Sequence, residues 1–173
     1  MSQSFRPPPD QASTTLDLRH DQPQDRLLLT LHQRGQPRQW WLTRVLTLRW
    51  VSAWLEQLQA VPLPEVPLSF LPTAKARDLA QEHALSLEFE GPKAAPQAGS
   101  GSTAQSAALC EEVKMELSPL ECRLELHADQ HAALITLTRR DAHCLLEMLA
   151  LVARQAGWLD APDWPAWLGR AQT

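Results

Sequence analysis

The chain has 173 residues, which fits one domain and is long enough to bury a core. Apolar residues make up 44% of it and charged residues 21%, a balance typical of globular proteins, and its longest apolar runs fall far short of the ~20 residues that span a bilayer. The formal net charge of −4 does not favour general binding to nucleic acid, because that affinity comes from Lys and Arg side chains that neutralise phosphates.

The first thirteen residues contain the run RPPPD and little that could pack in a core. We expect residues 1–13 to be disordered. They also lack the basic flank and apolar stretch of a secretory signal, and the three cysteines of the chain include no CxxC pair. These features predict a cytoplasmic protein with free thiols.

Residues 14–60 follow the pattern of three strands and a helix. Leu27, Leu29 and Leu31 alternate along one segment, and Trp40 and Leu42 along the next, which is the period of a strand with one buried face. TLDLR at 15–19 is a shorter stretch of the same kind. After residue 45 the apolar side chains recur at positions 48, 51, 55 and 58, the spacing of a helix.

The middle of the chain has a different composition. Residues 61–90 open with VPLPEVPLSFLP, and its four prolines predict an extended crossing segment. A short helix at 73–83 and a strand at 85–90 are expected to follow. Residues 91–107 are rich in Gly, Ser, Ala and Pro and predict a flexible linker.

The second half repeats a motif of the first. LTLHQRGQPRQWWLTR at 29–44 returns as LELHADQHAALITLTR at 124–139, with six identities at a constant offset of 95 residues. At the same offset CEEVK at 110–114 matches TLDLR, and a helical pattern at 140–153 matches the first helix. Residues 108–158 therefore predict a second unit of three strands and a helix, followed by a Trp-rich tail at 159–173.

The predicted fold class is α+β, with two tandem βββα repeats that form a mainly antiparallel sheet with helices on one face. Thr43 and Thr138 stand where the last strand of each unit meets its helix, and a Thr hydroxyl can accept a hydrogen bond from a free N–H of the first helical turn. Asp141 completes a capping box with Thr138, and Gly157 predicts the end of the second helix.

No pattern of metal-binding or catalytic residues stands out. Cys122 and His127 have opposite parity on one strand, while His143 and Cys144 are adjacent on a helix, so their side chains diverge by about 100°. The chain contains neither HExxH nor GxSxG, and its cysteines lie in apolar patterns that favour unreactive thiols. We therefore expect a protein that is not an enzyme and that binds no metal or cofactor.

The tryptophans suggest an interaction surface. Trp40 and Trp41 are adjacent on a strand, so one should lie in the core and the other should be exposed or covered by a partner. Trp50 and Trp54, four residues apart, share one face of the first helix. That face is either buried within the monomer or partly used as an interface, where Trp is favoured. Trp41, Trp50 and Trp54 are the candidate interface residues.

An alternative hypothesis starts from arginines near the strand-to-helix junctions. Arg44, Arg139 and Arg140, with Trp41 nearby in sequence, could grip single-stranded nucleic acid on a sheet surface. Several glutamates between residues 111 and 125 would repel phosphates close to this surface. The alternative function is therefore single-stranded nucleic-acid binding through these three arginines.

The favoured prediction is a non-enzymatic, cytoplasmic protein-interaction or scaffolding module. Its expected partner is a second copy of itself, in a homodimer, or another protein. No membrane association is expected.

Overall fold

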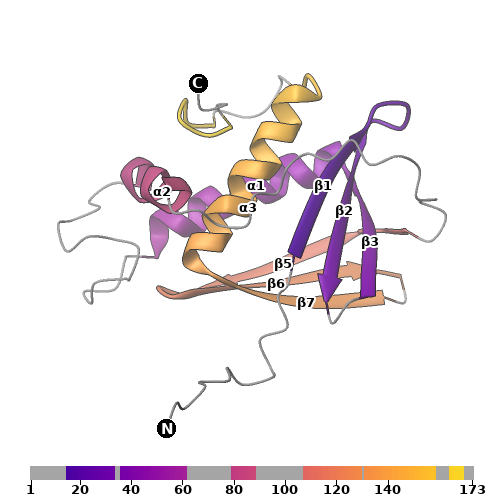
Figure 1. Cartoon of the computed structure of the whole chain (residues 1–173), viewed down its shortest axis with the longest axis horizontal. Helices are drawn as coiled ribbons and strands as arrows, with labels where there is room; N and C mark the ends of the chain where they lie inside the picture. The colour runs from indigo at the N-terminus through magenta and orange to yellow at the C-terminus, as the bar shows by residue number, and fades with distance from the viewer. Residues whose placement is uncertain are drawn as a thin grey trace, which may run out of the picture.

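The computed structural model describes residues 15–33, 36–61, 79–88, 107–129, 131–158 and 164–169. The expectations for residues 1–13 and for nearly all of the crossing segment and the linker fall outside these ranges. Within them the fold is mixed α+β, with two sheets and three helices (Figure 1). The strands are β1 (Thr15–Asp21), β2 (Arg26–Gln33), β3 (Gln36–Thr43), β4 (Ala108–Leu109), β5 (Glu112–Leu117), β6 (Glu121–Ala128) and β7 (His131–Thr138). The helices are α1 (Arg44–Ala60), α2 (Leu79–Glu88) and α3 (Arg139–Gln155).

Each sheet is built on an antiparallel three-stranded meander. The first has the order β1-β2-β3-β4, in which only the two-residue β4 pairs in parallel, and the second has the order β5-β6-β7. Side chains alternate between the two faces of each strand, so every second side chain points toward the core. On β6 the inward side chains Cys122, Leu124 and Leu126 are fully buried, while the residues between them are exposed or half-buried.

One short stretch of chain passes from the first sheet to the second. The backbone N–H of Cys110 donates to the carbonyl of Trp41 on β3 at 2.8 Å, and the N–H of Glu111 donates to the carbonyl of His127 on β6, also at 2.8 Å. Two neighbouring residues thus bond to different sheets, which fixes the sheets relative to each other.

Helices α1 and α3 pack on the inward faces of both sheets (Figure 1). Helix α1 contacts β3 of its own sheet and β5 of the other, and α3 contacts β6 and β7 of its own sheet and β1 of the other. A single cluster of buried apolar side chains runs through both sheets and both helices. The core is therefore shared between the two halves, and burial of either helix depends on the other half of the chain.

Three successive elements have matching bounds in the two halves. Strands β2 and β3 and helix α1 begin at residues 26, 36 and 44, and strands β6 and β7 and helix α3 begin at residues 121, 131 and 139. The strands that precede them do not follow the same offset. Leu18 pairs with Leu29, eleven residues later, whereas Met115 pairs with Leu124, nine residues later. The expected alignment of 15–19 with 110–114 is therefore wrong by two residues, because the first hairpin is longer.

The predicted strand at 85–90 is wrong over residues 85–88, which lie in helix α2. Residues 85–88 were expected to begin a strand because Leu85, Leu87 and Phe89 alternate with polar residues. They instead form the last turn of α2. The reason is tertiary: the buried positions of this helix, Glu82, His83 and Ser86, follow helical spacing and face α3.

The helix ends follow the sequence closely. The hydroxyl of Thr43 accepts from the N–H of Leu46 at 3.2 Å, and that of Thr138 accepts from the N–H of Asp141 at 3.1 Å. At the other end of α3, Gly157 has φ 75°, and the N–H of Trp158 donates to the carbonyl of Ala153. Both predicted Thr caps and the predicted stop are confirmed, and the Asp141 carboxylate accepts from the Thr138 hydroxyl at 2.8 Å.

Removing one cap should have a measurable cost. We expect Thr138→Ala to lower the free energy of unfolding by about 1 kcal/mol, because the N–H of Asp141 loses its acceptor. Chemical denaturation of the variant measures this loss. Thr136→Ala, at an exposed position two residues earlier on β7, is the matched control and should change stability much less. Equal losses in the two variants would contradict the capping role.

Candidate functional site

A groove lies between helix α1 and strand β5, with a volume of about 210 Å³. The amide of Gln57 donates to the carbonyl of Met115 at 3.3 Å and ties the helix to the strand. The wall is mainly apolar, and Arg49 is its one charged side chain. The lining residues are Leu46, Arg49, Trp50, Ala53 and Gln57 from α1, and Val113 and Met115 from β5.

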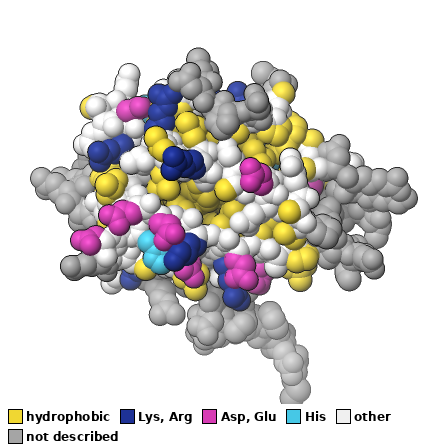
Figure 2. Space-filling view, turned by 180° about the vertical axis from the view of Figure 1, so that it is seen from behind, with side chains coloured by type: hydrophobic (Ala, Val, Ile, Leu, Met, Phe, Trp, Pro, Cys, Tyr) yellow, Lys and Arg dark blue, Asp and Glu magenta, His cyan; other side chains and the backbone are white. Residues whose placement is uncertain are grey.

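The groove belongs to a wider apolar surface. In Figure 1, α1 and β5 lie on the far side, and the view from behind in Figure 2 shows hydrophobic side chains gathered across the centre of that side, with Lys and Arg side chains among them. Val45 and Leu109 are 58% and 45% exposed. Leu109 pairs with Trp41, four residues before Val45, so both lie near the start of α1. Exposed apolar area of this kind is typical of contact surfaces.

One face of α1 carries a stripe of exposed residues, called here the α1 stripe. Its members follow at intervals of three or four residues and therefore align along the helix. Ala53 lies near the centre of the stripe, with Arg49 four residues before it and Glu56 three residues after it. The α1 stripe consists of Val45, Arg49, Ala53, Glu56 and Ala60, all of them exposed.

The candidate interface tryptophans lie inside the chain. Trp54 has no exposed surface, Trp50 is 4% exposed, and their rings stack with centroids 5.5 Å apart. Trp40 faces the shared core, and Trp41 lies on the opposite face of the sheet, beside its cross-strand partner Leu28. Trp41 and Leu28 are also buried. The bulk of the tryptophan surface therefore stabilises the monomer, and only Trp50 borders the groove.

The structure does not bring the three arginines together. Arg139 is 1% exposed, and its guanidinium binds Glu82 and the carbonyl of Val61 at the end of α1. Arg140 pairs with the carboxylate of Asp141 at 3.1 Å. Arg44 starts α1, so it lies the length of that 17-residue helix, about 25 Å, from Val61 and Arg139. The arginines form no common phosphate-binding patch.

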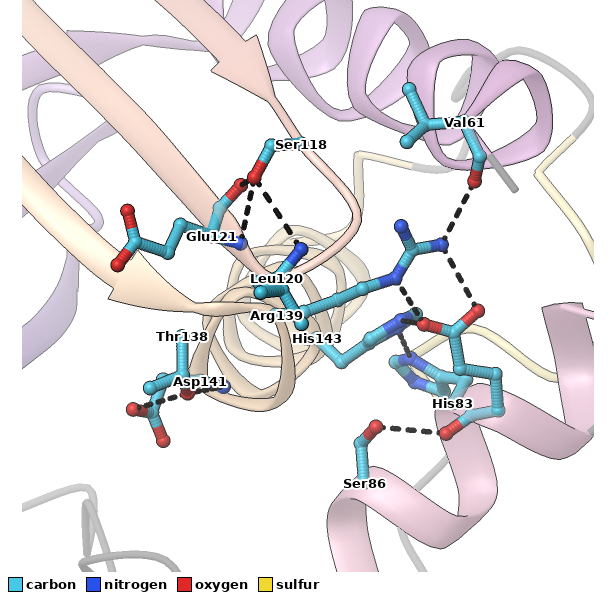
Figure 3. Close-up of polar contacts among 11 residues, drawn as sticks. Val61, His83, Ser86, Ser118, Leu120, Glu121, Thr138, Arg139, Asp141 and His143 are labelled. Carbon is cyan, nitrogen blue, oxygen red and sulfur yellow. Dashed lines mark hydrogen bonds and ion pairs between the residues drawn. The ribbon is translucent and has the colours of Figure 1, made fainter. Parts of the chain in front are cut away.

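A buried polar cluster joins α2 to α3 (Figure 3). It has an ion pair at one end, in which Arg139 Nη2 lies 3.2 Å from Glu82 Oε2 and Arg139 Nε binds Glu82 Oε1. The Nε2 of His143 lies 2.9 Å from the same Oε1 atom. One carboxylate therefore holds a guanidinium and an imidazole, and all three side chains are at most 3% exposed.

The cluster continues through a pair of imidazoles. The Nδ1 atoms of His83 and His143 lie 3.1 Å apart, and His83 Nε2 lies 3.0 Å from Glu147 Oε2. The ring of Trp167 packs against His83 with centroids 4.7 Å apart, and the N–H of Gly169 donates to Glu147 Oε2 at 2.8 Å. Residues 164–169 thus close the cluster on the side away from Arg139.

Burial and hydrogen bonding set the charges of this cluster. Burial opposes ionisation of Glu82, but the hydrogen bonds from His143 and Arg139 outweigh it and hold the pKa of that carboxyl below its ordinary value. Burial lowers the pKa of His143, although its hydrogen bond to Glu82 opposes this effect. His143 is therefore neutral and Glu82 ionised at neutral pH.

Sequence reasoning missed this cluster. Arg139, His143 and Glu147 follow one another at intervals of four residues on α3 and so form a polar stripe along the helix. Such a stripe usually faces solvent. Their partners on α2 lie 57 to 64 residues away in sequence. The polar stripe was the available signal, but nothing local distinguishes a stripe covered by a second helix from a solvated one.

The cysteines and the metal-binding residue types add no reactive site. Burial raises the pKa of the Cys122 thiol to about 12 and also raises those of Cys110 and Cys144, so these thiols are protonated at neutral pH. Within the ranges that the structure describes, no three His, Cys, Asp or Glu side chains are grouped so that they could hold a metal ion.

Comparison of the chain with protein-family models, with curated proteins and with solved structures finds no match. None of the helices in the described ranges is long and apolar enough to cross a membrane.

Proposed function

We propose that this chain is a non-enzymatic, cytoplasmic protein-interaction module that self-associates through the face formed by α1 and β5. The observation that carries the proposal is the apolar groove beside the α1 stripe, together with the exposed side chains of Val45 and Leu109. Surfaces with an apolar centre and a few charges are typical of contacts between proteins.

A second copy is the occupant that the charges favour. In a two-fold contact each residue of one copy faces its symmetry-related position on the other. If two α1 helices pack antiparallel with the crossing point between Ser52 and Ala53, Arg49 of each copy faces Glu56 of the other, and the small Ala53 side chains allow the helices to approach closely. The α1 stripe is thus complementary to itself.

The internal symmetry of the chain supports the same mode of assembly. We propose that residues 14–60 and 108–158 are two βββα copies that pack as the subunits of a dimer do. In support, their last two strands and helix have matching bounds, and each helix contacts the first strand of the other sheet. Self-association of the whole chain would repeat, between two copies, the kind of packing that joins its two units.

Nucleic-acid binding has less support. Arg139 is occupied by Glu82, and the five glutamates around β5 and β6 are all exposed. Their carboxylates would repel phosphates near this sheet. These residues are Glu111, Glu112, Glu116, Glu121 and Glu125.

A charge exchange on the α1 stripe tests the proposal. We expect Arg49→Glu and Glu56→Arg each to weaken self-association at least tenfold, because each places like charges opposite one another across the contact. The double variant should restore it, since the pairing is then reversed but intact. Light scattering on each purified protein measures the mass in solution.

Matched controls use exposed positions elsewhere. Glu88→Arg on α2 makes the same change of charge away from the α1 stripe and should leave the mass unchanged. Self-association that survives both single variants would place the contact on another face. Failure of the double variant to recover would contradict the antiparallel arrangement.

A further inference from the structure

The face of α2 that is buried against α3 is polar. Its buried residues are Glu82, His83 and Ser86, whereas its leucines are only half-buried. Ser86 is satisfied within its own helix, because its hydroxyl donates to the carbonyl of Glu82 at 2.8 Å. The attachment of α2 therefore depends on the ionisation of Glu82, His83 and their partners on α3 more than on apolar burial.

The hydrogen bonds limit how many protons the two histidines can hold while α2 is docked. The His143 Nε2 atom faces a carboxylate and must carry a proton, as must His83 Nε2 opposite Glu147. The two Nδ1 atoms face each other at 3.1 Å, and only one of them can carry a proton if they are to form a hydrogen bond. The docked pair can thus hold at most three ring protons, and so at most one positive charge.

Among the residues that the structure describes, the charged groups around His143 belong to this cluster. Helix α2 contributes Glu82 and His83, and α3 contributes Arg139 and Glu147. The segment 164–169 carries no titratable side chain and supplies the N–H of Gly169 and the ring of Trp167. When the histidine pair carries one positive charge, that charge and the Arg139 guanidinium balance the carboxylates of Glu82 and Glu147.

We propose that α2 is an acid-released latch on α3, in which the facing histidines accommodate one positive charge and expel a second. Once α2 leaves, both imidazoles are solvated and each can be doubly protonated below its ordinary pKa of about 6.5. Release therefore takes up a proton. It also uncovers the face of α3 that carries Arg139 and His143, so acidification changes which surface the protein presents.

Below pH ~6.5 the released state binds more protons than the docked state, so acid favours release. For His143, whose pKa is lowered in the fold, docking is most stable above pH ~6.5 and weakens as the pH falls below that value. Glu82, whose pKa is also lowered, acts in the same direction at still lower pH. For one linked proton the docking equilibrium falls by about tenfold per pH unit.

Hydrogen exchange measured by mass spectrometry on the full chain tests the latch between pH 8 and pH 5.5. After correction for intrinsic exchange, amide protection in residues 79–88 should fall by about tenfold per unit below pH ~6.5, while that of α1 stays constant. His143→Gln keeps a donor for Glu82 and an acceptor for His83 but cannot take a second proton, so its protection should be independent of pH in this window. His32→Gln, at a histidine outside the cluster, should behave as the wild type does.

Two results would overturn the latch. One is constant protection of residues 79–88 in the wild type across the window, which needs no variant to interpret. The other is a fall in protection that is as steep in His143→Gln as in the wild type.

Discussion

Substitution of Trp54 by glutamate should abolish the native fold. The Trp54 side chain has no exposed surface and stacks on Trp50 within the core shared by both halves. Loss of a buried Trp alone costs about 3–5 kcal/mol, and an unpaired buried carboxylate adds several more. The total rivals the 5–15 kcal/mol by which domains of this size are usually stable. Circular dichroism should show loss of native structure and no cooperative thermal transition.

A conservative change at the same position is the control. The indole N–H of Trp54 is buried and, among the residues that the structure describes, meets no hydrogen-bond acceptor. Phenylalanine therefore loses volume but no hydrogen bond, and Trp54→Phe should fold with a reduced melting temperature. A folded, cooperative Trp54→Glu protein would contradict the assignment of this side chain to the core.

The second large effect is expected at Glu82. Glu82→Gln keeps the shape of the side chain but removes the negative charge that compensates Arg139. Breaking a buried ion pair by removing one partner costs about 3–5 kcal/mol, because the other charge stays buried and uncompensated. Denaturant titration should show this loss in the free energy of unfolding, or an intermediate in which α2 is released first.

Glu88→Gln makes the same change at an exposed position of the same helix. It should alter stability by less than about 0.5 kcal/mol, since surface substitutions seldom do more. A loss at Glu82 as small as that at Glu88 would show that the buried pair contributes little to holding α2.

Local chemistry made much of this fold predictable. The alternation of Leu27, Leu29 and Leu31 located β2, and the change to helical spacing after Thr43 located α1. The Thr caps were readable because a cap involves residues only three positions apart. Antiparallel hairpins between neighbouring strands followed from the same short-range patterns, and the structure contains them.

Long-range contacts account for what sequence reasoning missed. The segment 85–88 alternates like a strand, but the contacts of Glu82 and His83 with α3 make it helical. Arg139 has the sequence surroundings of a surface cation, and only its distant partner Glu82 buries it. The two-residue difference between the first hairpins depends on turn geometry, including Asp25 at φ 49°, which the repeat pattern does not encode.

The burial of the tryptophans could not be predicted from their spacing. Spacing alone placed Trp50 and Trp54 on one helical face but could not decide whether that face was core or interface. The structure assigns the face to the core and leaves the neighbouring α1 stripe exposed. The candidate contact surface thus lies beside Trp50 and Trp54 on the same helix.

The most direct measurement is the mass of the wild-type chain in solution across a concentration series, by sedimentation equilibrium. Self-association through the α1 stripe predicts a reversible rise from 19.4 kDa toward twice that mass as concentration increases, with added salt weakening the contact between Arg49 and Glu56. A constant mass of 19.4 kDa at every concentration would contradict the proposed function.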